Sequence, residues 1–146
     1  MNKILSIIIP SYNTAPYIDE CLPTMLSEKV IDDIEILLIN DGSKDNTAEI
    51  AEKYVKKYPQ SVRFINKENG GHGSVLNRGI EEATGKYYKV IDGDDWVETE
   101  GLEKLVEELK DIDADMIISP FYWHMIEDNS RKFIEVGNNT YNQIFN

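Results

Sequence analysis

The 146-residue sequence contains one cysteine, two histidines and no hydrophobic run long enough to span a membrane. The single cysteine, Cys21, excludes an internal disulfide and is typical of a reducing compartment. The apolar run 4–9 is too short for the core of a signal peptide and leads into a proline rather than a cleavage site. We therefore predict a cytoplasmic protein with no integral membrane span, which is compatible with peripheral membrane association.

Basic residues are also scarce. Lysine and arginine together number 15 against 27 aspartates and glutamates, which gives a formal charge of -12. This balance argues against a nucleic-acid-binding surface, and an anionic ligand would need a cation or backbone dipoles to mediate its binding. The hydrophobic fraction of 41% and the length predict one folded domain over residues 1–146.

Apolar runs and amphipathic segments alternate along the chain. We expect buried strands at 4–9, 34–39, 62–65 and 87–91. Helical patterns lie between these runs, and one of them covers about 74–84. The alternation predicts an α/β fold with a mostly parallel central sheet and helices on both faces. Pro10 should end the first strand, and a later strand is expected at 133–136.

Three carboxylates follow the strand expected at 87–91 directly, in Asp92-Gly93-Asp94-Asp95. Carboxylates crowded at the end of a strand repel one another unless a cation lies between them. Mg²⁺ and Mn²⁺ are the natural candidates, because hard divalent cations prefer oxygen ligands. Asp92 and Asp94 face one site if Gly93 opens a turn. The alternative is a solvated acidic turn that caps a helix.

Two other loops should reach the same edge of the sheet, because strand-to-helix connections in a parallel sheet leave from one side. Tyr12, in the first loop, could stack on a nucleobase or pack on the first helix. Asp41, in the second loop, could accept hydrogen bonds from a ribose or a base, or close an Asx turn.

A glycine-rich segment, 70–73, precedes the helix expected at 74–84. Its glycines allow the backbone to approach a ligand closely, and free N–H groups at the helix start favour a diphosphate or a sugar hydroxyl. A flexible turn is the simpler alternative. His72 has few side chains around it that could bury it, so we expect a polar contact to the ligand.

The segments 7–13, 38–47 and 90–96 together resemble family 2 glycosyltransferases, which have the GT-A fold. The resemblance covers about the first hundred residues and depends on three motifs in order. It implies transfer of a sugar, with inversion, from a nucleotide-diphosphate sugar, with a UDP-sugar favoured. The acceptor hydroxyl would belong to a glycan or a lipid-linked acceptor, in the synthesis of a cell-surface polysaccharide or glycoconjugate.

The resemblance also implies roles for individual residues. Asp92 and Asp94 would hold Mn²⁺ or Mg²⁺. The residues expected to bind the donor are Pro10, Tyr12, Asn13, Asp41, Gly71, His72, Asp92 and Gly93. No acidic residue after Trp96 matches the catalytic base of the family. We therefore expect the base to lie beyond Asn146, in a longer protein, and the 146-residue chain to bind a donor without efficient transfer.

Two other functions fit part of the pattern. A haloacid-dehalogenase-like phosphatase would use Asp92 as its nucleophile, but it would carry Thr or Val at the position of Trp96 and would open its domain with the motif strand. A fragment that binds a nucleotide-sugar without turning it over is the second alternative. A dinucleotide-dependent oxidoreductase is disfavoured, because no Gly-x-Gly-x-x-Gly follows the first strand.

Overall fold

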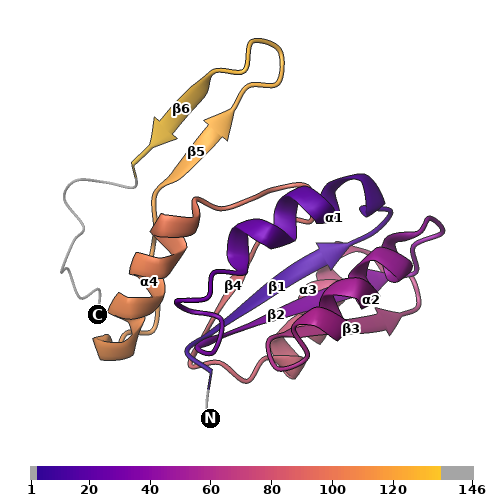
Figure 1. The fold of residues 1–146 in the computed structure, drawn as a ribbon, viewed down its shortest axis with the longest axis horizontal. Helices are drawn as coiled ribbons and strands as arrows, with labels where there is room; N and C mark the ends of the chain where they lie inside the picture. The colour runs from indigo at the N-terminus through magenta and orange to yellow at the C-terminus, as the bar shows by residue number, and fades with distance from the viewer. Residues whose placement is uncertain (1–2, 136–146) are drawn as a thin grey trace. The chain divides into compact units, whose positions relative to one another are not determined.

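The computed structural model describes residues 3–135, drawn in colour in Figure 1. The chain divides into two compact units, Met1–Ile112 and Asp113–Asn146. The predicted single domain over 1–146 stays a prediction.

A four-stranded parallel sheet forms the centre of the first unit and confirms the predicted fold class. Its strands are β1 (Leu5–Ser11), β2 (Ile34–Asp41), β3 (Val62–Lys67) and β4 (Tyr87–Val90). They lie in the order β3-β2-β1-β4. The chain therefore builds outward from β1 to β3 and then returns to the other side of β1. Ligands bind at such a reversal in open α/β sheets, beyond the carboxyl ends of the strands.

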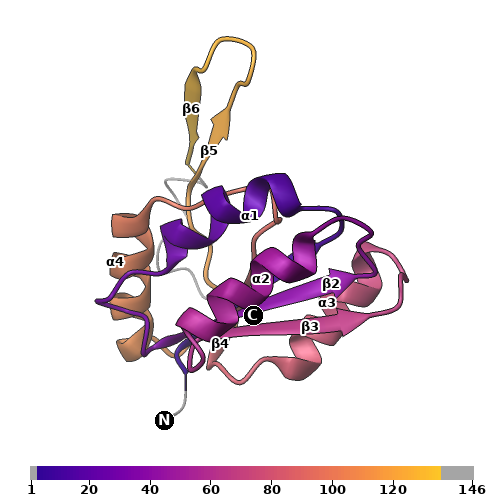
Figure 2. The ribbon, with the colours of Figure 1, turned by 45° about the vertical axis from the view of Figure 1, so that its right-hand side comes forward.

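Helices cover both faces of this sheet (Figures 1 and 2). One face carries α1 (Ala15–Cys21), the 3₁₀ helix η1 (Leu22–Met25), α2 (Thr47–Lys57) and α4 (Thr99–Asp111), and the other carries α3 (His72–Glu82). Side chains alternate between the faces because successive residues of a strand point in opposite directions. Ile7 and Ile9 pack in the larger cluster, and Ile8 packs with Val75 of α3.

Pro10 does not end β1, which is a correction to the sequence analysis. The strand continues through Pro10 to Ser11, and Pro10 pairs with Ile39 of β2. The pairing of β1 with β4 stops at Ile8 and Val90. Pro10 therefore has a strand on one side only, and a proline at such an edge position does not interrupt the ladder on the other side.

Helix α3 begins at His72, two residues earlier than expected, and ends at Glu82. Gly71 precedes the helix with a φ of 80°, a conformation that glycine adopts readily. The early start places His72 and Gly73 of the glycine-rich segment in the first turn of the helix, with His72 at its N-terminus.

The second unit contains an antiparallel hairpin of β5 (Phe121–His124) and β6 (Arg131–Ile134), in which Phe121 pairs with Ile134. The strand expected at 133–136 thus lies at 131–134, and residue 136 is outside the described residues. Residues 112–120 form neither helix nor strand.

No helix within residues 3–135 is both long and apolar enough to cross a membrane.

Candidate functional site

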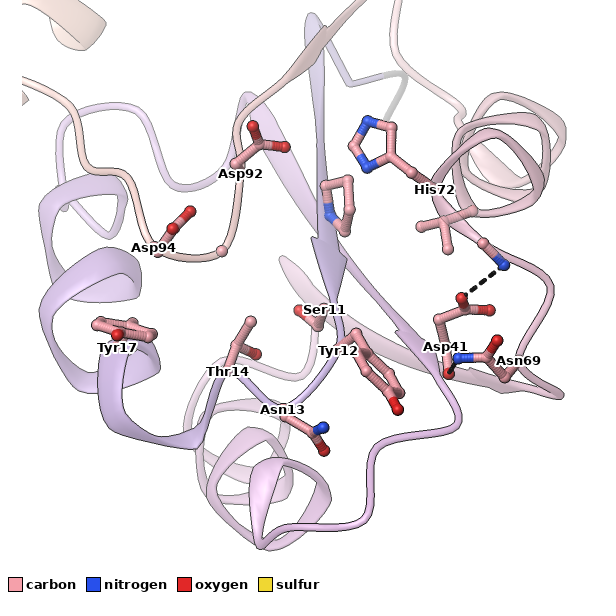
Figure 3. Close-up of a pocket in the computed structure, with 14 residues that line it drawn as sticks. Ser11, Tyr12, Asn13, Thr14, Tyr17, Asp41, Asn69, His72, Asp92 and Asp94 are labelled. Atoms are coloured by element: carbon pink, nitrogen blue, oxygen red, sulfur yellow. Dashed lines mark hydrogen bonds between the residues drawn. The ribbon is translucent and has the colours of Figure 1, made fainter. Parts of the chain in front are cut away.

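A pocket of about 470 Å³ opens at the carboxyl ends of the parallel strands. All nine residues predicted to bind the donor or a metal line it: Pro10, Tyr12, Asn13, Asp41, Gly71, His72, Asp92, Gly93 and Asp94. Figure 3 shows the acidic turn on one side of the pocket and Asp41 with Asn69 on the other, with Tyr12 between them. The volume lies within the range of small-molecule sites.

The acidic cluster forms a turn at Gly93, which is the condition under which Asp92 and Asp94 were expected to face one site. The Asp95 N–H donates to the Asp92 carbonyl at 2.9 Å, and Gly93 and Asp94 occupy the turn. Gly93 is buried, whereas Asp92 and Asp94 are exposed. Both carboxylates line the pocket from one short segment after β4 (Figure 3).

The loop after β1 and the loop after β2 are tied together by hydrogen bonds. The Asn13 N–H donates to Ser43 Oγ at 2.9 Å, and the Lys44 N–H donates to Asn13 Oδ1 at 2.9 Å. Asn13 has a φ of 53°, which asparagine tolerates better than most residues. The Thr14 N–H donates to Thr47 Oγ1 at 3.0 Å. One wall of the pocket is thus fixed by the chain's own hydrogen bonds, and the side-chain oxygen of Asn13 already accepts one of them.

Asp41 is buried and is held by the glycine-rich segment. Its Oδ1 accepts hydrogen bonds from Lys67 Nζ at 2.5 Å and from the Gly70 N–H at 2.9 Å, and its Oδ2 accepts the Gly71 N–H at 2.9 Å. Burial opposes the charge of Asp41, but these hydrogen bonds outweigh it and lower the pKa of the carboxyl. Asp41 is therefore a fixed anion on the wall of the pocket.

The Asx turn that the sequence offered as an alternative role for Asp41 is not formed. The Ser43 N–H donates to Asn40 Oδ1 at 3.2 Å. The Asp41 carboxylate instead accepts the N–H groups of Gly70 and Gly71. At the start of α3 the N–H groups of His72 and Gly73 are left for a ligand, because those of Ser74 and Val75 donate to the Gly71 carbonyl at 3.0 and 3.3 Å.

His72 is exposed and lines the pocket from the first turn of α3 (Figure 3). Sequence reasoning missed the other lining residues, which are Ser11, Thr14, Tyr17, Asn69 and Val75. Thr14 Oγ1 is buried without a hydrogen-bond partner among the described residues. The sequence predicted segment 11–14 as a loop at the carboxyl ends of the strands, where the pocket lies. Nothing in its pattern singled out Thr14.

Comparison with known proteins identifies the family. Residues 6–145 match the family model described as glycosyl transferase family 2. The chain belongs to glycosyltransferase family 2. This confirms the resemblance inferred from the three motifs, and it removes the support for a phosphatase.

A curated family 2 relative is an uncharacterized glycosyltransferase, EpsJ, from Bacillus subtilis. It is 41% identical over 122 residues, which cover 84% of this chain and 35% of EpsJ. The chain thus spans about a third of the length of this relative.

Two solved structures confirm the GT-A fold. One is Staphylococcus aureus TarS residues 1–349 in complex with UDP, which is 28% identical with a TM-score of 0.64. The match covers 73% of this chain and 32% of that one. The other is a mannosyltransferase from Pyrobaculum calidifontis in complex with GDP-Man and Mn²⁺, which is 23% identical with a TM-score of 0.62. This match covers 75% of our chain and 32% of the mannosyltransferase chain, and it shows a similarity in fold.

The acidic turn of this family 2 chain fits a hard divalent cation. The atoms that the turn offers to a metal are carboxylate oxygens, the ligand type that Mg²⁺ and Mn²⁺ prefer. Burial, followed by the charges of Asp94 and Asp92, raises the pKa of the neighbouring Asp95. Within residues 3–135 no three His, Cys, Asp or Glu side chains are grouped to hold an ion by themselves. The pocket can therefore supply part of a coordination shell, which a ligand and water would have to complete.

Proposed function

We propose that this chain is the donor-binding part of an inverting glycosyltransferase that takes a nucleotide-diphosphate sugar, with a UDP-sugar as the donor. The sugar goes to the hydroxyl of a glycan or lipid-linked acceptor in the synthesis of a cell-surface polysaccharide or glycoconjugate. The proposal rests on family membership and on the UDP complex of TarS.

One observation carries the proposal: Asp41 and Tyr12 share a pocket with Asp92 and Asp94 at the carboxyl ends of the parallel strands. A nucleoside diphosphate needs a base site at one end and charge compensation at the other. The fixed Asp41 carboxylate can accept an N–H of the base, and the half-exposed ring of Tyr12 offers a stacking surface. The acidic turn lies on the opposite side of the pocket (Figure 3).

Asp92 and Asp94 would hold Mn²⁺ or Mg²⁺, together with oxygens of the donor diphosphate and water. A bound cation supplies Lewis-acid stabilisation of the charge on the departing nucleoside diphosphate. His72 and the N–H groups at the start of α3 contribute polar contacts to the diphosphate or the sugar. Pro10 and Gly93 shape the floor of the pocket, because the glycine lets the turn lie against the Pro10 carbonyl.

Inversion requires a base that removes the proton of the acceptor hydroxyl as that hydroxyl attacks the anomeric carbon. No residue of the described pocket is assigned to this role. We therefore expect the 146-residue chain to bind a donor and to transfer it inefficiently.

Calorimetric titration of the chain with UDP tests the proposal. We expect binding with Mn²⁺ that weakens markedly in EDTA. Asp94→Ala should reduce the affinity in Mn²⁺ to that of the native chain in EDTA, because it removes one of two ligands from the turn.

Asp32→Ala is the matched control, since it makes the same change of charge at an exposed site before β2, at the opposite edge of the sheet. UDP affinity that is independent of Mn²⁺, or equal in Asp94→Ala and Asp32→Ala, would contradict the proposal. Efficient sugar transfer by the 146-residue chain would contradict the expectation about the missing base.

A further inference from the structure

The buried carboxylate of Asp41 has almost no hydrogen-bonding capacity left. A carboxylate offers about four acceptor positions, two on each oxygen. Lys67 Nζ and the Gly70 N–H fill both positions on Oδ1, and the Gly71 N–H fills one on Oδ2. One acceptor position therefore remains for a ligand, and it lies on Oδ2.

Lys67 is itself fully engaged. Besides Asp41, its ammonium group donates to the Glu68 carbonyl at 2.6 Å and to Ser74 Oγ at 2.8 Å. An ammonium group has three donors, and these three contacts use them all. The side chain is mostly buried, with 20% of it exposed. Lys67 therefore remains on Oδ1 and is not available to a ligand.

This arrangement distinguishes nucleobases by the number of N–H donors that they present together. The pairing edge of uracil carries one N–H, at N3, between two carbonyl oxygens. The corresponding edge of guanine carries two adjacent donors, the N1–H and the 2-amino group. A carboxylate with one open position on each oxygen would accept both guanine donors, whereas Asp41 can accept one. A guanine bound here would leave a buried donor unpaired, which weakens binding.

We propose that Lys67 determines base specificity: by occupying Oδ1 of Asp41 it limits the base site to a single N–H donor and so selects uridine over guanosine nucleotides. This inference rests on the proposed function, in which Asp41 contacts the base. Lys67 acts through Asp41 and does not touch the donor, so it is a positioning residue.

The test compares UDP and GDP by calorimetry in Mn²⁺. We expect the native chain to bind UDP at least about tenfold more tightly than GDP, the order of effect of one unpaired donor. Lys67→Met removes the ammonium group and opens the second position on Oδ1, while Gly70 and Gly71 still hold the carboxylate. The ratio of the GDP to the UDP dissociation constant should then fall about tenfold.

Two variants separate specificity from a general loosening of the loop. Ser74→Ala removes one partner of Lys67 but leaves Oδ1 occupied, so both nucleotides should weaken alike and the ratio should stay as in the native chain. Lys67→Arg keeps a donor for Oδ1 and should also keep the ratio. If Lys67→Met does not fold, Lys67→Gln serves in the same titration, because its shorter side chain withdraws the donor from Oδ1.

Three outcomes would overturn the proposal. Equal affinity of the native chain for UDP and GDP is one, and a ratio that the Lys67→Met or Lys67→Gln variant leaves unchanged while UDP still binds is another. In either case the proposed function survives. Failure of the native chain to bind either nucleotide in Mn²⁺ would overturn both the inference and the proposed function.

Discussion

Replacement of Gly93 by alanine tests whether the position of the acidic turn matters. A Cβ atom at this position would lie 2.9 Å from Thr14 Cγ2 and 3.0 Å from the Pro10 carbonyl oxygen. Non-bonded carbon atoms prefer about 3.5–4.0 Å, so the turn would have to move by roughly 0.6–1 Å. Pro10 is held in β1 by its pairing with β2, so the turn is the part that shifts. The effect is steric, because Gly93 is not among the glycines with positive φ.

The size of the functional effect follows from that displacement. A misplacement of about 1 Å at a positioned group can cost about 100-fold. The turn carries both Asp92 and Asp94, so its displacement moves both expected metal ligands. We expect Gly93→Ala to weaken Mn²⁺-dependent UDP binding by about 10- to 100-fold. Crowding of this kind also costs about 1–3 kcal/mol of folding free energy.

Calorimetry with UDP in Mn²⁺ and in EDTA measures the effect, and urea denaturation shows that the variant remains folded under the same conditions. Gly101→Ala in α4 is the control, because its nearest neighbour, Glu98 Cβ, would lie at an ordinary 3.6 Å. The reasoning fails if Gly93→Ala binds UDP in Mn²⁺ as tightly as Gly101→Ala does.

Three further predictions concern the frame around the site. Gly79→Ala should lower the free energy of unfolding by about 1–3 kcal/mol, measured by urea denaturation, because the new methyl group would overlap Cγ2 of the fully buried Ile8. Unchanged stability would contradict the close packing of α3 on β1. Burial opposes the charge of Glu35, but hydrogen bonds from Ser6 and Thr84 and the charge of Arg63 outweigh it and lower its pKa. Its contribution to stability is therefore present at neutral pH and lost as the pH falls through that lowered pKa, so Glu35→Gln should flatten the decline of the urea midpoint in acid. Burial, followed by the charges of Asp95 and Asp94, raises the pKa of Cys21 to about 12. A thiol reagent should therefore modify Cys21 only in concentrated urea, and rapid modification of the folded chain at neutral pH would refute its burial.

The sequence predicted the architecture because short buried strands leave a direct signal. Runs such as 34–39, apolar and rich in β-branched residues, identify strands covered on both faces, and their alternation with helical patterns implies a parallel sheet. From that topology the convergence of the loops at one edge follows without any knowledge of side-chain contacts. All the expected site residues line one pocket for this reason, although their roles stay predictions.

Of the details that the sequence did not predict, two depend on residues far apart in the chain and one is local. Whether Pro10 can lie inside β1 depends on where β4 stops, about 80 residues later. The ion pair of Asp41 with Lys67 joins residues 26 positions apart, and no local pattern selects that lysine from the 15 cations of the chain. The start of α3 depends on the positive φ of Gly71, which a glycine permits but does not require.

The charges around the pocket explain why an anionic donor would arrive with a cation. No lysine or arginine is among the residues that line the pocket, and Asp92 and Asp94 face it unneutralised by any ion pair in the described part of the chain. Lys67, which holds Asp41, is paired with that carboxylate, and Arg78 of α3 pairs with Glu82 at 2.7 Å. A diphosphate alone would meet two carboxylates and no positive side chain among the residues that line the pocket. A divalent ion held by Asp92 and Asp94 would offset that repulsion, and we therefore expect the affinity for UDP to depend on the metal.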